Sequence, residues 1–143
     1  MDRITLIREF VKTIDEYIEV ENDNRFCVDI EEEIIYIPYE LNEEEDRIWS
    51  QFLKQEFNVD FNPYLMSVLH EIGHIVTYTE DLNEERNVIY FLLQMKYEED
   101  NFEEFNREYF NIPMEYHATE WAINYYRNHE VECNNIICKL SEV

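Results

Sequence analysis

The sequence predicts an α+β fold in which a small β-sheet of two to three strands packs on a bundle of helices. Apolar residues recur at helical spacing through most of the 143 residues, and only two short runs are β-branched and aromatic. A single glycine disfavours turn-rich all-β folds. This length, with 45% apolar residues, fits one domain over residues 1–143 with a substantial core.

The N-terminal part combines a helix with a pair of strands. Residues 3–20 carry apolar side chains at helical spacing and predict a first helix. Residues 25–29 and 34–39 flank an acidic segment and predict a hairpin that Pro38 ends. The strand over 34–39 is a candidate edge for pairing with an extended substrate, although its acidic neighbours also fit an ordinary protected edge.

The remaining sequence predicts helices. Asn42 caps a helix over 43–57, whose first turn is acidic. Asn62 and Pro63 begin a helix that is apolar on nearly all sides, which predicts a buried position. An acidic connection is expected over 80–85. Further helices are predicted over 84–98, 101–109 and 113–128, and residues 133–140 fit either a strand or a helix.

The acidic composition restricts the partners. The chain has 34 acidic and 11 basic side chains and a formal net charge of -23. A phosphate backbone or an anionic membrane would be repelled, so we expect neither direct nucleic-acid binding nor membrane association. Solubility alone would explain this charge, and a basic protein or peptide substrate is its natural complement. The single glycine also excludes glycine-rich phosphate loops.

Targeting and cysteine features favour a cytoplasmic protein. The N-terminus has no apolar signal core, and no window of the chain approaches a membrane span. The odd number of cysteines fits a reducing compartment better than a disulfide framework. Cys133 and Cys138 have no matching Cys or His pair, so buried free thiols are expected there rather than a zinc clip.

The predicted buried helix carries the chemistry. It contains His70 and His74, whose i, i+4 spacing places two imidazoles on one helical face where both can bind one ion. Glu71 points in another direction and can reach a water bound to that ion. This is the HExxH arrangement of two zinc ligands and a general base. Burying these groups without a purpose would be costly, although two hydrogen-bonded core histidines would also fit the pattern.

A third metal ligand must come from another element, and Glu115 on the helix over 113–128 is the preferred candidate. Ala118, Thr119 and Ala122 share its face, so the two helices can approach closely. The Thr119 hydroxyl could accept the Nδ1–H of a ligating histidine and fix its tautomer. The rival third ligands are His117, Glu120 and Asp81.

The one glycine, Gly73, lies inside the motif. Glycine within a helix costs about 1 kcal/mol relative to alanine. We therefore expect Gly73 to provide room, either for a crossing backbone or for a metal-bound water.

The motif and the later Glu115-x-x-Ala118-x-x-Trp121-Ala122 pattern resemble the ImmA/IrrE-type metallopeptidases. Those proteins are minimal zincins of the gluzincin kind, and known members act on, or in response to, repressor-type transcription regulators of bacteria, phages and mobile elements. The resemblance implies a zincin fold with His70, His74 and Glu115 as zinc ligands and Glu71 as catalytic base. Family members usually have Asn or Asp where this chain has Thr119.

The predicted function is therefore zinc-dependent hydrolysis of a protein or peptide. Glu71 is the expected catalytic base, and the expected cofactor is one Zn²⁺ per chain. An oxyanion donor is also needed, and the candidates are Tyr78, Tyr109, Tyr116 and His117. Two alternatives stay open: a zincin-like protein that binds a basic partner without efficient turnover, and an acidic DNA mimic.

Overall fold

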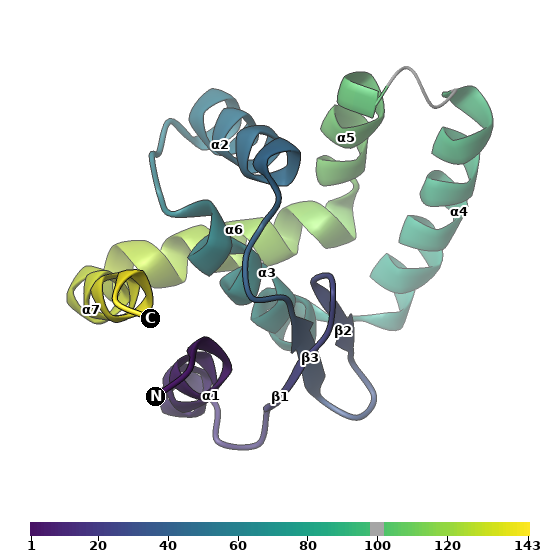
Figure 1. Ribbon diagram of the computed structural model, residues 1–143. Coiled ribbons are helices and arrows are strands. Elements are labelled where there is room, and N and C mark those ends of the chain that lie inside the picture. Colours follow the sequence, from purple (N-terminus) through teal and green to yellow (C-terminus); the bar gives the residue numbers. More distant parts are fainter. Residues whose placement is uncertain (98–101) are drawn as a thin grey trace.

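The computed structural model of the chain describes residues 1–97 and 102–143, and it confirms a mostly helical α+β fold with a small three-stranded sheet (Figure 1). The sheet and the surrounding helices enclose one central helix, α3. The elements in chain order are α1 Arg3–Ile14, β1 Glu19–Asn22, β2 Cys27–Asp29, β3 Ile34–Ile37, α2 Glu43–Phe57, α3 Pro63–Thr77, α4 Glu80–Lys96, α5 Phe102–Phe110, α6 Pro113–Asn128 and α7 Glu130–Ser141.

The predicted first helix is too long, because its last residues form a strand. α1 ends at Ile14, and β1 follows at Glu19–Asn22. Ile18 and Val20 are fully buried while Glu19 between them is exposed. This period of two is the strand signal, which the helical spacing of the preceding residues obscured.

The predicted hairpin is confirmed, but its second strand is not an edge. β2 pairs with β3 antiparallel, and β1 pairs with the other side of β3 in parallel, which gives the order β1-β3-β2. β3 is therefore the central strand, and the predicted edge over 34–39 is wrong. The edge next to α3 is β2, where Cys27 lies opposite Tyr36 of β3. The missed strand β1 is the reason for the difference.

The helix starts predicted from capping residues are confirmed for α2 and α3. The Asn42 side chain accepts a hydrogen bond from the Glu45 backbone N–H at 2.8 Å. The Asn62 side chain accepts one from the Leu65 backbone N–H at 2.9 Å, with Pro63 in the first turn. Every residue of α3 from Tyr64 to His74 is buried, as its apolar composition predicted.

The acidic connection predicted over 80–85 is instead the start of α4. Thr79 caps this helix by accepting a hydrogen bond from the Leu82 backbone N–H at 3.1 Å, and acidic first-turn residues suit the helix dipole. α4 ends at Lys96, so residue 98 of the predicted helix lies outside the described residues, as does residue 101 of the next one.

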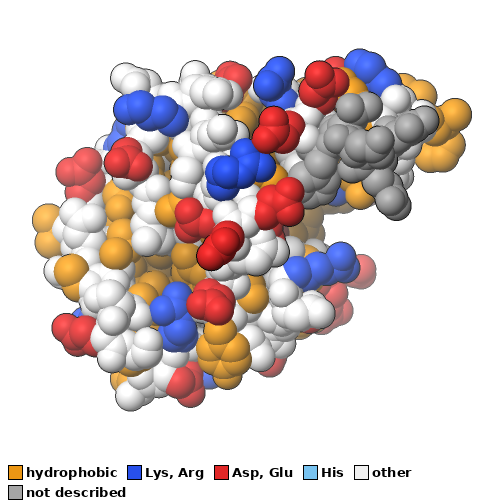
Figure 2. All heavy atoms as spheres, turned by 45° about the horizontal axis from the view of Figure 1, so that its top comes forward, with side chains coloured by type: hydrophobic (Ala, Val, Ile, Leu, Met, Phe, Trp, Pro, Cys, Tyr) orange, Lys and Arg blue, Asp and Glu red, His pale blue; other side chains and the backbone are white. Residues whose placement is uncertain are grey.

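The apolar residues that predicted this helix do not enter the core. Among the apolar side chains of α4, Leu93 is buried, whereas a stripe of other large apolar side chains is more than half exposed. α4 projects from the body beside α5, and apolar side chains gather at that edge of the molecule in Figure 2. The exposed stripe consists of Val88, Phe91, Leu92 and Met95.

The ambiguous C-terminal segment is a helix. In α7 the Cys133 thiol is buried as expected, whereas Cys138 is exposed, so the expected burial of Cys138 is wrong. α7 packs on α1, and the Arg3 guanidinium donates to the Leu140 carbonyl at 3.0 Å. Among the described helices, none is long and apolar enough to span a bilayer.

The closest packing in the fold involves α3 and α6. A Cβ atom at Gly73 would lie 2.5 Å from the backbone oxygen of Ala118 and 3.0 Å from its Cα. Ala118 and Ala122 are fully buried on the facing side of α6. Gly73 thus provides room for a crossing backbone, the first of the two expected explanations.

We predict that Gly73→Ala lowers the free energy of unfolding by about 1–3 kcal/mol, measured by urea denaturation. Alanine would gain about 1 kcal/mol of helix propensity, but the clash is with backbone and cannot be relieved by rotating a side chain. Asn124→Ala at an exposed position of α6 is the control and should change stability by less than about 0.5 kcal/mol. Equal stability of Gly73→Ala and the control would contradict the close crossing.

Candidate metal centre

Two histidines and a carboxylate converge where α3 crosses α6. His70 and His74 from α3 and Glu115 from α6 are all buried, and their ligand atoms lie within 4.8 Å of one another. Glu115 Oε1 is 3.5 Å from His70 Nε2, and Glu115 Oε2 is 3.1 Å from His74 Nε2. The structure therefore brings together the three residues that the sequence placed at one ion.

The donor set fits a tetrahedral zinc site. Nitrogen and oxygen ligands about 2.0–2.1 Å from a tetrahedral ion lie about 3.3 Å from each other. Glu115 Oε1 lies 3.5 Å from His70 Nε2 and 3.2 Å from His74 Nε2, and these two separations bracket that value. Two imidazoles and one carboxylate are also the ligands of known catalytic zinc sites, which leave a fourth position for water. These residues could hold a metal ion, and their chemistry suits zinc.

Thr119 fixes the tautomer of His70, as predicted. Its hydroxyl donates to the Glu115 backbone carbonyl at 3.1 Å, so its lone pair accepts from His70 Nδ1, 2.9 Å away. In this arrangement His70 Nδ1 donates to Thr119, and Nε2, which faces Glu115, can offer its lone pair to a metal. His74 Nδ1 is buried and has no hydrogen-bond partner in the described part of the chain.

The rival third ligands lie away from this cluster. His117 and Glu120 are exposed on the opposite side of α6, where they approach each other to 3.9 Å. Asp81 is exposed in the first turn of α4. The helical periodicity of α6 turns His117 and Glu120, two and five positions after Glu115, away from α3, whereas Asp81 belongs to α4.

The electrostatics of the cluster favour an ionised Glu115. Burial alone would raise the pKa of Glu115, but its interactions with His70 and His74 outweigh burial and hold this pKa far below its usual range. Burial would lower the pKa of His74, and the hydrogen bond to Glu115 reverses that effect and raises it. The carboxylate thus stays negative and available to a cation.

Glu71 lies beside this cluster with a different environment. Burial raises its pKa and the adjacent Glu115 adds to the effect, while His70 and His74 act in the opposite direction. Its side chain lines the same pocket as His74 and Glu115. A buried carboxylate with a raised pKa next to a metal group is suited to accept and release a proton.

Sequence reasoning missed Arg86, which supports Glu115 from α4. Its Nε lies 3.9 Å from Glu115 Oε2, and one terminal N–H group donates to the Tyr109 hydroxyl at 3.2 Å. Burial raises the pKa of Tyr109, and the Glu115 charge raises it further, so the phenol keeps its proton. The sequence gives no signal for this role, because Arg86 lies within the helix predicted over 84–98 and its contact with Glu115 depends on how α4 packs against α6.

An open pocket of about 430 Å³ adjoins the cluster. The edge strand β2 contributes one wall through Cys27 and Val28, and α4 contributes the other through Arg86 and Tyr90. Glu71, His74 and Glu115 also line the pocket. A substrate in this pocket would therefore lie between a free sheet edge and the candidate metal group.

Only one of the four oxyanion candidates lines this pocket. Tyr109 does so, whereas Tyr116 is not among the lining residues and stacks on Phe57 with 5.4 Å between ring centroids. His117 and Tyr78 are exposed and do not line the pocket. Tyr109 lies on the side of its helix that borders the pocket. The sequence alone does not specify which side of a helix borders the pocket, so it could not choose among the four candidates.

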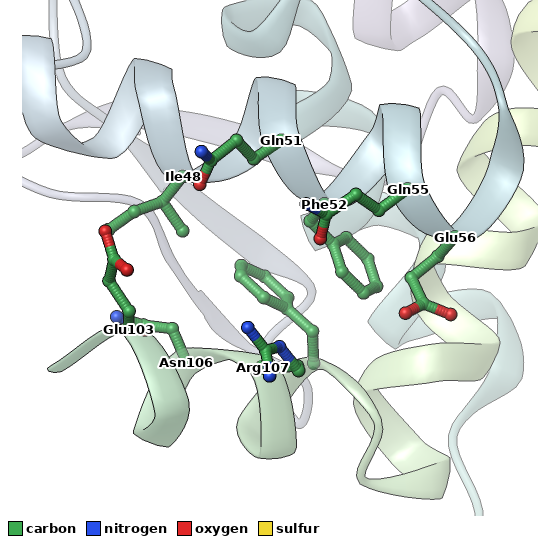
Figure 3. Close-up of a pocket in the computed structure, with 9 residues that line it drawn as sticks. Ile48, Gln51, Phe52, Gln55, Glu56, Glu103, Asn106 and Arg107 are labelled. Atoms are coloured by element: carbon green, nitrogen blue, oxygen red, sulfur yellow. The ribbon is translucent and has the colours of Figure 1, made fainter. Parts of the chain in front are cut away.

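A second pocket of about 180 Å³ lies between α2 and α5 (Figure 3). Its residues point toward one another from the two helices, with Gln51 and Gln55 on the α2 side and Arg107 on the α5 side. None of its lining residues is a histidine or a cysteine. This second pocket therefore lacks the histidine ligands found at the pocket beside His70, His74 and Glu115.

Comparison with known proteins adds no assignment: no protein-family model, curated protein or solved structure matches this chain. The resemblance to ImmA/IrrE-type metallopeptidases therefore stays a prediction from the residues quoted in the sequence analysis.

We predict that Glu115→Ala abolishes stable zinc retention, measured as the zinc content of purified protein and by competition with a chromophoric chelator. The variant keeps two imidazoles but loses the anionic ligand that lies within 3.5 Å of both. Glu120→Ala, an exposed glutamate on the same helix, is the matched control and should bind zinc as the wild type does. Equal affinities of the two variants would place the third ligand elsewhere.

Thr119→Val should weaken zinc binding by about 10–100-fold, because partners that orient a ligating histidine contribute about that much to metal affinity. Thr119→Ser keeps the hydroxyl that His70 requires and should retain most of the affinity. Chelator competition measures both variants. If the valine and serine variants bind zinc equally well, the hydroxyl does not orient His70.

Proposed function

We propose that this protein is a zinc-dependent peptidase that hydrolyses a protein or peptide bond with Glu71 as general base. The observation that carries the proposal is the buried His70, His74 and Glu115 group with Glu71 in the same open pocket. A structural metal site would close its coordination sphere, whereas this group offers three ligands next to a pocket. The proposed cofactor is one Zn²⁺ per chain, held by those three residues.

The residues of the pocket would share the work of hydrolysis. When bound, zinc supplies a Lewis acid that polarises the scissile carbonyl and lowers the pKa of water toward about 7. Glu71 takes the proton of the attacking water and passes it to the leaving amine. Tyr109, which lines the pocket and keeps its hydroxyl proton, is the best-placed donor for the developing oxyanion.

The edge strand β2 would bind the substrate backbone. It pairs with β3 on one side, and Cys27 and Val28 line the pocket. An extended peptide can add to such an edge through main-chain hydrogen bonds. This assigns to β2 the substrate-pairing role that the sequence suggests for residues 34–39.

By the resemblance, a repressor-type regulator is the proposed substrate class. A non-enzymatic binding role is the alternative function, and the experiment below distinguishes it from peptide hydrolysis.

We predict that Glu71→Gln keeps zinc but lowers peptide hydrolysis by at least about 100-fold, because a general base contributes about 10²–10⁴-fold and glutamine cannot accept the proton. Zinc content and cleavage of a quenched-fluorescent peptide library of mixed sequence are measured on the same preparation. Glu120→Gln, an exposed carboxylate away from the pocket, should leave both quantities unchanged.

The outcomes separate the two functions. Loss of cleavage with intact zinc supports the peptidase. Full cleavage by Glu71→Gln would exclude Glu71 as the base, and absence of cleavage in the zinc-loaded wild type would favour a binding role.

A further inference from the structure

The pocket beside the candidate metal group contains two arginines, although the chain as a whole is strongly acidic. The charged residues that line it are Arg25, Arg86, Glu71 and Glu115, together with His74. The chain has 34 acidic and 11 basic side chains, so two arginines among so few charged lining residues are unexpected. Both acids in this pocket already have roles, Glu115 in the ligand group and Glu71 as the proposed base.

Arg86 is held in place on the α4 wall. Its guanidinium lies 4.7 Å from the centroid of the Tyr90 ring and donates to the Tyr109 hydroxyl at 3.2 Å. Its side chain is 27% exposed, so part of the guanidinium is accessible from the pocket. Arg86 is therefore a fixed cation with N–H groups still available.

Arg25 stands on the opposite wall, two residues before the start of the edge strand β2. Its side chain is exposed and lines the pocket together with Cys27. Burial raises the pKa of the Cys27 thiol and the nearby Glu71 charge adds to it, while Arg25 acts in the opposite direction. The Cys27 thiol is thus close to both Arg25 and Glu71, which brings this second cation into the electrostatic environment of the pocket.

We propose that Arg25 and Arg86 form a subsite that binds a carboxylate of the substrate. The inference rests on the proposed peptidase function, because a peptide laid along β2 would pass between these two residues. Guanidinium groups bind carboxylates through paired charge-assisted hydrogen bonds. The carboxylate belongs either to an Asp or Glu side chain of the substrate or to its free C-terminus.

The overall charge limits what surrounds that carboxylate. A polyacidic substrate would be repelled by a net charge of -23 before it reached the pocket. Acidic and basic side chains also alternate over the face seen in Figure 2, so that face presents no broad cationic surface. The subsite therefore selects one carboxylate within an otherwise neutral or basic peptide.

The test measures peptide binding by the zinc-loaded Glu71→Gln protein, which separates affinity from turnover. Fluorescein-labelled peptides of one neutral sequence carry either an internal Glu with an amidated C-terminus, Gln at that position with an amidated C-terminus, or Gln with a free C-terminal carboxylate. Fluorescence anisotropy gives each Kd. We expect the better of the two carboxylate peptides to bind roughly tenfold more tightly than the neutral peptide, and their ranking identifies the source of the carboxylate.

Arginine substitutions in the Glu71→Gln protein test which residues cause the preference for a carboxylate peptide. Arg25→Gln and Arg86→Gln should each reduce it, while Arg127→Gln, an exposed arginine on α6, should leave it unchanged. Because Arg86 contacts Glu115, zinc content is measured in every variant, and Arg86→Lys keeps the charge. Arg25 is not in contact with the metal group, so its variant tests the subsite independently.

The results distinguish this inference from the proposed function. Equal affinity for all three peptides, or a preference that survives both glutamine variants, overturns the subsite. Cleavage of the neutral and carboxylate peptides at equal rates by the wild type would also overturn it while leaving the peptidase intact. A carboxylate preference without any cleavage by the wild type would overturn the peptidase and leave the binding subsite.

Discussion

The contact on which the site depends is the close approach of α3 to α6 at Gly73 and Ala118. A Cβ atom at Gly73 would meet the backbone oxygen of Ala118 at 2.5 Å, so this separation requires glycine. The residues flanking that contact then face each other at hydrogen-bond distance, His70 with Thr119 and His74 with Glu115. A larger residue at position 73 would move the backbones apart and separate the imidazoles from the carboxylate.

The close approach of α3 and α6 brings ionisable groups into the core, and neighbouring side chains offset the cost of burying them. Burying ionisable groups is costly unless they are paired or bind a metal. Glu115 has partners on three sides: His70 and His74 from α3 and Arg86 from α4. The same arrangement leaves Glu71 open to the pocket rather than to the ligand group. The acidic surface acts at long range, on the encounter with a partner. The arginines of the pocket act at short range, on the chemical group of the partner that enters the pocket.

The sequence predicted the centre better than its surroundings, for physical reasons. His70, His74 and Glu115 were predictable because helical spacing and the need for a third ligand constrain them, and Thr119 followed from its position one turn after Glu115. Arg86 and the role of β2 were not, because both depend on tertiary placement. The strand β1 was hidden because Tyr17 and Ile18 continue the helical spacing of the residues before them, and the pairing of β1 with β3 makes β2 an edge of the sheet. The exposed stripe on α4 shows likewise that periodicity predicts a helix without stating which face it buries.

We propose that the crossing of α3 and α6 forms a three-ligand zinc site that opens into a pocket. Anomalous diffraction at the zinc edge, on crystals of protein purified without chelators, tests it most directly. The predicted result is one zinc ion per chain at about 2.0–2.2 Å from His70 Nε2, His74 Nε2 and a Glu115 oxygen, with the fourth position facing β2 and α4. A zinc peak at another site, or no peak in crystals soaked with zinc, would contradict the claim.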